Sequence, residues 1–257
     1  MLRLAALFLA AVLLVPSAAG STDPSRDLVP DLVTRSPAKI FVQVGKHGRR
    51  VVRFSNEVVN VGIGPLELRP RVGDCNRNGD LRDDRASYQR IYRDTDGDAR
   101  FARGVDARFR TRSAGCTRFH PVHKHWHFEA LAEYALLQLQ APGSNGPSVV
   151  AGKKVSSCVL DTKRRLPKAP GSPRRKFYGS CRRDSVGGIS IGWGDLYGSR
   201  VSGQELDIST LSDGAYCLVT RADPENRLLE SNERNNGRTT RIVLRGETVD
   251  WHPYQRC

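Results

Sequence analysis

The sequence has few cysteines, no long apolar stretch and no dense basic cluster, and each shortage excludes a class of protein. Its six cysteines form no C-x-x-C pair, so a zinc ribbon or a thioredoxin-type redox site is unsupported. Inside the chain no apolar run reaches the roughly 18 residues of a membrane span, which excludes a protein with several spans. The hydrophobic fraction of 39% is that of a folded globular protein.

The formal net charge is +14, but the basic residues are scattered. Short runs occur only at 163–165 and 174–176, within a proline-containing segment (163–176) that we expect to be an exposed loop. Proteins that bind single-stranded nucleic acid space basic residues among aromatic ones, and that pattern is missing. We therefore do not expect nucleic acid as a partner.

The first twenty residues have the pattern of a secretory signal. Met1-Leu2-Arg3 is a short positive start, residues 4–15 are apolar, and Ser17-Ala18-Ala19 provides the small residues of a cleavage site. An uncleaved membrane anchor is the alternative, for which the run is short. We expect residues 1–20 to be a signal peptide and residues 21–257 to form one secreted domain, with no transmembrane span after cleavage.

In an exported protein we expect the cysteines to form disulfides. An even number in an oxidising compartment suggests three disulfides, although the sequence alone cannot choose among the many pairings. Pairing of neighbours along the chain is a hypothesis that gives Cys75–Cys116, Cys158–Cys181 and Cys217–Cys257.

Hydrophobic patterning indicates an all-β protein. Short alternating or β-branched runs, separated by glycine and proline turns, favour an Ig-like β-sandwich with long irregular loops, stapled by disulfides. Residues 71–100 are polar, with Asp-Asn-Gly clusters, and give no strand signal. The predicted strands are 39–44, 51–61, 66–68, 126–139, 149–160, 188–193, 215–220 and 239–244.

Four of the six histidines lie within residues 120–128, His-Pro-Val-His-Lys-His-Trp-His-Phe. On a strand, the alternate spacing of His123, His125 and His127 would point all three imidazoles to one face. Three neutral imidazoles suit Cu(II) or Zn(II) and do not suit calcium. His120 lies off this alternation and would be a fourth ligand or a residue that orients one. A solvated histidine-rich strand with incidental metal affinity is the alternative.

The histidine segment and its continuation to residue 137 resemble the copper-binding segment of the lysyl oxidases. In that family, histidines in His-x-His-x-His order bind copper. The resemblance therefore implies that His123, His125 and His127 bind Cu²⁺. It extends over about residues 29 to 245, although the spacing between the matching segments differs from the family's.

Two further segments resemble those that supply the family's cofactor, lysine tyrosylquinone, which copper and oxygen make from a lysine and a tyrosine. Residues 152–162 (GKKVSSCVLDT) place the lysine at Lys154, next to Lys153. Residues 195–198 (DLYG) place the tyrosine at Tyr197.

Asp195 lies two residues before Tyr197 and would share a strand face with it, so we predict Asp195 as the general base. A structural aspartate in a turn is the alternative. Asp161 and Glu129 are other candidates for the base.

Two segments near the ends of the chain, 30–33 and 229–236, resemble those that hold calcium in lysyl oxidase-like proteins. Asn232 stands where an aspartate is usual, and the missing charge should weaken Ca²⁺ binding. A polar turn that caps a hairpin is the alternative. By position, the ligands would be Asp31, the carbonyl of Leu32, Glu230, Asn232, Asn235 and Asn236.

Taken as a whole, the resemblance implies a secreted copper-dependent amine oxidase. It would use O₂ to oxidise primary amines or the lysines of a protein substrate to aldehydes, releasing H₂O₂ and ammonia. The alternative is a non-catalytic exported β-sandwich that binds copper and calcium but does not form the cofactor. Whether Lys154 and Tyr197 meet near the copper separates the two hypotheses.

Three other motifs are typical of a serine hydrolase or of calcium-binding loops. Residues 188–192 match G-x-S-x-G, but the residues that follow are poor helix formers, so a serine hydrolase is not expected. Segments 74–80 (DCNRNGD) and 94–98 (DTDGD) look like fragments of calcium loops. Neither has the bidentate glutamate of a complete loop, so turns explain them better, with weak cation binding left open.

Overall fold

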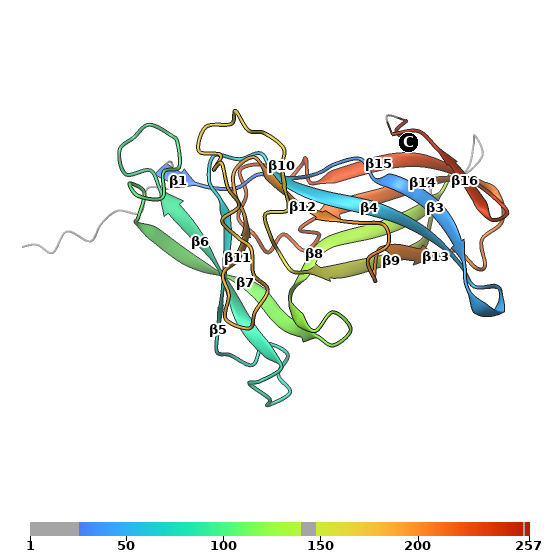
Figure 1. The fold of residues 1–257 in the computed structure, drawn as a ribbon, viewed down its shortest axis with the longest axis horizontal. Coiled ribbons are helices and arrows are strands. Elements are labelled where there is room, and N and C mark those ends of the chain that lie inside the picture. Colours follow the sequence, from blue (N-terminus) through green and yellow to red (C-terminus); the bar gives the residue numbers. More distant parts are fainter. Residues whose placement is uncertain (1–25, 140–147, 254) are drawn as a thin grey trace, which may run out of the picture.

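A computed structural model describes residues 26–139, 148–253 and 255–257. The predicted signal peptide (1–20) and the first residues of the predicted domain (21–25) lie outside this part of the chain. Regular structure in the described residues is almost entirely β (Figure 1). No helix in them has the length and hydrophobicity needed to cross a bilayer.

The described residues include a short 3-10 turn, η2 (Lys46–Gly48), and a series of short and long strands. They are β1 (Asp27–Leu28), β2 (Leu32–Thr34), β3 (Ala38–Val44), β4 (Arg50–Asn60), β5 (Leu66–Arg71), β6 (Asp84–Arg93), β7 (Phe109–His120), β8 (His125–Gln138), β9 (Ser148–Ser157), β10 (Lys163–Arg164), β11 (Gly187–Ile189), β12 (Trp193–Tyr197), β13 (Glu205–Asp207), β14 (Gly214–Ala222), β15 (Gly237–Arg245) and β16 (Thr248–Trp251).

The strands form two antiparallel sheets. The larger has the order β11-β5-β6-β7-β8-β14-β15-β16, with β1 paired to β6 and β9 paired to β8. The smaller has the order β10-β12-β4-β13, with β2 and β3 also paired to β4. In Figure 1, β5, β6 and β7 lie at one end of the molecule and β15 and β16 at the other, with the long β8 between them.

Apolar side chains from both sheets fill the space between them. Phe54 of β4 is fully buried and meets Tyr134 of β8 edge-on, with ring centroids 4.9 Å apart. One core cluster combines these strands with β14 and β15, and a second surrounds Phe128 and Trp193. The predicted all-β sandwich is confirmed.

Three disulfides join Cys75 to Cys116, Cys158 to Cys181 and Cys217 to Cys257. The hypothesis of pairing between neighbours is therefore confirmed. The first ties the β5–β6 connection to β7, and the second ties the end of β9 to the loop before β11.

No strand was predicted in the polar segment 71–100, but β6 lies within it, and β7 was also missed. Both strands are rich in polar residues, several of which are buried, so their sequences give little hydrophobic alternation. Gln89 of β6 is fully buried because its amide exchanges hydrogen bonds of 2.9 and 2.7 Å with the backbone of Leu229. The predicted strand 188–193 is divided between β11 and β12, because Gly192 turns the chain with a φ of 73°.

Candidate metal centre

The histidine segment forms a β-hairpin. β7 ends at His120, β8 begins at His125, and these two residues are paired across the strands. Because cross-strand partners and residues two apart share a face, His120, His125 and His127 project from the same side. His123 lies in the turn 121–124, so a continuous strand over the three predicted ligands was wrong. The turn carries His123 over the same face.

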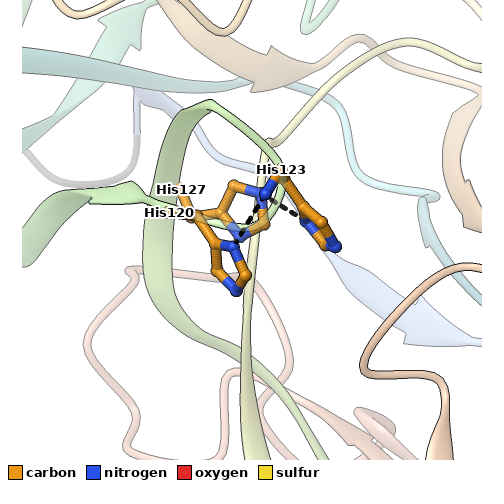
Figure 2. Close-up of side chains that lie close together, drawn as sticks. All are labelled: His120, His123 and His127. Carbon is orange, nitrogen blue, oxygen red and sulfur yellow. Dashed lines mark hydrogen bonds between the residues drawn. The ribbon is translucent and has the colours of Figure 1, made fainter.

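The imidazoles of His120, His123 and His127 converge (Figure 2). One nitrogen from each lies within 4.8 Å of the others. His123 Nδ1 is 3.2 Å from His127 Nε2, and the rings of His120 and His123 stack with centroids 4.2 Å apart. The ring of His125 lies 4.8 Å from that of His127, at the edge of the group. The structure therefore gathers two predicted ligands with His120 and places the third beside them.

The environment of these rings favours the neutral form that binds a metal. Burial lowers the pKa of His127 to about 3, and the neighbouring imidazoles lower it further. Burial also lowers the pKa of His120 and of His123. His123 Nε2 is buried and has no hydrogen-bond partner. Neutral, crowded imidazoles with a free buried nitrogen fit Cu(II) or Zn(II).

Ser156 of β9 orients one of these rings. Its Oγ lies 3.1 Å from His127 Nδ1, which leaves Nε2 directed at the other imidazoles. Groups that hydrogen-bond the far nitrogen of a histidine ligand fix its tautomer and orientation. Ser156 could not be singled out from the sequence, because the contact depends on the pairing of β8 with β9.

Tyr197 lies on the opposite face of β9. It ends β12 in the smaller sheet, and its hydroxyl donates a 3.0 Å hydrogen bond to the carbonyl of Cys158. Burial raises the pKa of Tyr197 well above its ordinary value; Asp195 raises it further, whereas a hydrogen bond with Ser157 lowers it. Residues 156–158 therefore touch the histidine group on one side and Tyr197 on the other.

Asp195 is buried between the sheets, on the same face of β12 as Tyr197, as its spacing predicts. Burial raises the pKa of Asp195 well above its ordinary value, and nearby Asp161 and Glu57 add to the effect. Its Oδ2 has no hydrogen-bond partner. A protonated or unpaired carboxyl beside the tyrosine can exchange a proton there, which keeps Asp195 as the candidate base.

The two lysines of β9 point to opposite faces. Lys154 pairs with Glu133 across the strands and forms a 2.7 Å ion pair with Glu225, on the same face as Ser156. Lys153 is half-buried opposite Tyr134, and burial lowers its pKa. Lys154 is thus on the histidine side of β9, whereas Lys153 shares its face with the residues that contact Tyr197.

The other candidates for the base have structural roles. Asp161 accepts hydrogen bonds from the amides of Phe177, Tyr178 and Ser190, and from the Ser190 hydroxyl. Glu129 forms an ion pair with Arg118. Ser190 is followed by strand β12, whereas a nucleophile elbow needs a helix directly after the serine.

The two calcium-like segments lie side by side. The amide of Leu32 donates to Glu230, and the Asn235 side chain donates a 2.8 Å hydrogen bond to Asp31. The side-chain amide of Asn236 donates to Glu230 over 2.9 Å, and its Oδ1 is buried and unpartnered. Asn232 is exposed and accepts from the amide of Arg234, within its own turn.

Two carboxylates that the sequence did not single out complete this group. Oxygens of Asp223 and Glu233 lie within 4.8 Å of one from Glu230. Burial raises the pKa of Glu230 to about 8, and Glu233 contributes to the rise. Glu233 brings a carboxylate to the region where Asn232 lacks one. Asp223 follows β14 and joins the group only through the fold.

These features define an all-β, disulfide-stapled protein with a cluster of imidazoles near a partly buried tyrosine. A family model described as lysyl oxidase matches residues 94–253, more than half of the chain. The chain belongs to the lysyl oxidase family.

Curated relatives agree with this assignment. The chain is 30% identical to lysyl oxidase homolog 4 of Mus musculus over 135 residues, which is 52% of this chain and 16% of the relative. It is 27% identical to lysyl oxidase homolog 3A of Danio rerio over 205 residues, 79% of this chain and 20% of the relative. Lysyl oxidase homolog 2 of Homo sapiens is 29% identical over 119 residues, 46% of this chain and 14% of the relative. The match thus spans a fifth or less of each relative.

Proposed function

We propose that the protein is a secreted copper-dependent amine oxidase. It converts a primary amine or a peptidyl lysine, with O₂ and water, to an aldehyde, ammonia and H₂O₂. Membership of the lysyl oxidase family supports this reaction class. The observation that carries the proposal is the convergence of neutral imidazoles from the β7–β8 hairpin beside a strand segment that also contacts Tyr197.

The histidines have the role of holding copper in this proposal. His123 and His127 are common to the predicted set and to the observed group, while His120 and His125 compete for the third position. A copper–quinone centre supplies an electrophilic carbonyl and a route for electrons to O₂. Asp195 removes or returns a proton beside Tyr197, and the buried setting keeps bulk water away from that exchange.

Lys154 must move for the cofactor to form. It is paired with Glu225 on one face of β9, while Tyr197 lies against the other face. A bond between the two side chains therefore requires the Lys154–Glu225 pair to open and the end of β9 to shift. This separation favours the second candidate function, a non-catalytic metal-binding module, if no such rearrangement occurs.

A redox stain for protein quinones separates the two functions. We expect the purified, copper-loaded chain to stain and to release H₂O₂ from a primary amine. The Tyr197→Phe variant should lose both signals yet bind the same amount of copper. An unstained wild-type protein at full copper occupancy would support the binding module.

Lys153 provides the matched control. Lys154→Met should abolish staining, and Lys153→Met should retain it, because the resemblance assigns the cofactor to Lys154. The opposite result would move the cofactor to Lys153, whose side chain faces the smaller sheet, where Tyr197 lies.

Export and calcium binding belong to the same proposal. Three disulfides, together with the signal pattern of residues 1–20, support an extracellular location. Calcium bound by Asp31, Glu230 and their neighbours would join β2 to the segment after β14. The unpartnered oxygens of Glu233, Asn235 and Asn236 fit a hard cation at this place.

A further inference from the structure

We propose that residues 74–84 form a second site for a hard divalent cation of the calcium class, separate from the histidines and from the Asp31–Glu230 region. This segment connects β5 to β6 and is tied to β7 by the Cys75–Cys116 disulfide. It contains one of the two aspartate-rich motifs that the proposed oxidase function leaves unused. The proposal does not depend on that function.

Two adjacent carboxylates carry the inference. Asp84 is fully buried, and its Oδ1 has no hydrogen-bond partner, while its Oδ2 accepts a 2.7 Å hydrogen bond from the amide of Asn76. Asp83 Oδ1 is also buried and unpartnered, while its Oδ2 accepts from the side chains of Asn76 and Asn78 at 3.2 and 2.9 Å. Both carboxylates are thus directed at the same loop, and each keeps one free oxygen.

Asp74 and Asn76 place further oxygens in the same loop. Asp74 accepts from the amides of Asn78 and Gly79 at 3.1 and 2.7 Å, and Asn76 Oδ1 accepts from the same Asn78 amide at 2.9 Å. Gly79 allows this tight path because its φ of 84° is unfavourable for other residues. Carboxylate and amide oxygens at alternate positions are the donors that calcium prefers.

The nearby arginines do not neutralise the two carboxylates. Arg82 is 86% exposed and pairs with Asp80, and Arg85 contacts the carbonyls of Leu81 and Asp84 and the carboxylate of Asp184. A buried carboxylate oxygen without a partner is costly, and a bound cation would remove that cost for both aspartates.

The second aspartate-rich motif differs in this respect. In residues 94–106, both oxygens of Asp94 and both of Asp106 accept hydrogen bonds from backbone amides. Within residues 94–106 no buried side-chain oxygen lacks a hydrogen-bond partner, so the inference is limited to residues 74–84, where Asp83 and Asp84 each keep one such oxygen.

Limited proteolysis reports on this loop alone. Trypsin can cleave after Arg77 and Arg82, both within the proposed site. With calcium at about ten times its Kd, local opening and hence cleavage at these two bonds should slow about tenfold relative to EGTA. Mass spectrometry of the full-length protein would measure these rates against cleavage after Arg174 in the same digest, which corrects for any effect of calcium on trypsin.

Variants assign the protection to the named residues. Asp84→Asn and Asp74→Asn should each abolish it, and Asp74→Asn serves if the buried substitution prevents folding. Glu230→Gln, in the other calcium-like region, should retain it. The proposal is overturned if calcium leaves the wild-type rates unchanged, or if the Asp74→Asn variant is protected as strongly as the wild type.

Discussion

Replacing Ser156 with alanine tests whether β9 organises the metal centre. The hydroxyl is 3.1 Å from His127 Nδ1 and is the contact that leaves Nε2 facing the other imidazoles. One neutral hydrogen bond is worth about 1 kcal/mol, or about fivefold in affinity. Loss of ring orientation adds to this, so we expect metal affinity to fall about tenfold or more.

Competition against a chromophoric chelator would measure the affinity, first with redox-inert zinc and then with copper. Ser157→Ala is the matched control, because Ser157 lies on the other face of β9, beside Tyr197. Its effect on affinity should stay below about twofold. Equal affinities for Ser156→Ala and the wild type, or an equal loss in both variants, would refute this account of how His127 is oriented.

Three predictions concern stability. Phe54→Ala should lower the free energy of unfolding by about 3–5 kcal/mol, because the ring is fully buried between the sheets; a urea titration showing under about 1 kcal/mol would contradict this. Gly64→Ala should lower the free energy of unfolding by about 3 kcal/mol, because the new Cβ would lie 2.0 Å from the carbonyl oxygen of Leu28. Gly104→Ala is the control: its Cβ would meet nothing within 4 Å, so the free energy of unfolding should hardly change. Burial raises the pKa of Glu230 to about 8, so without metal the folded state keeps a proton that the unfolded state has lost above pH about 5. Stability in EDTA should therefore fall as the pH rises toward 8, and Tm measurements should show a smaller fall for Glu230→Gln. An identical fall in the variant would show that Glu230 is not the source of the pH dependence.

The two faces of β9 hold different parts of the proposed site. Lys154 and Ser156 lie on the histidine side, and Ser157 and the carbonyl of Cys158 contact Tyr197. One short segment therefore separates the lysine from the tyrosine while touching both halves of the proposed site. A cofactor made from Lys154 and Tyr197 would require a movement of this segment, so the lysine variants are the sharpest test of the proposed function.

The short-range features of this protein were predictable from its sequence. Alternation and turn residues identified β3, β4, β5, β8, β9, β14 and β15, because each of these strands carries its own period of two, but they missed β6, β7 and most of the short strands. The clustered histidines indicated a metal, since the chemistry of imidazole does not depend on fold. The spacing of Asp195 and Tyr197 placed both on one face of β12, as observed.

Tertiary structure alone decided how these pieces meet. His120 joins the histidine group because the hairpin register pairs it with His125, and Lys154 faces Glu225 because of the pairing of β8 with β9. β6 escaped prediction because its buried Gln89 is satisfied by backbone far along the chain. Strand register and long-range hydrogen bonds are set by the packing of the whole chain, so a local pattern of residues does not contain them.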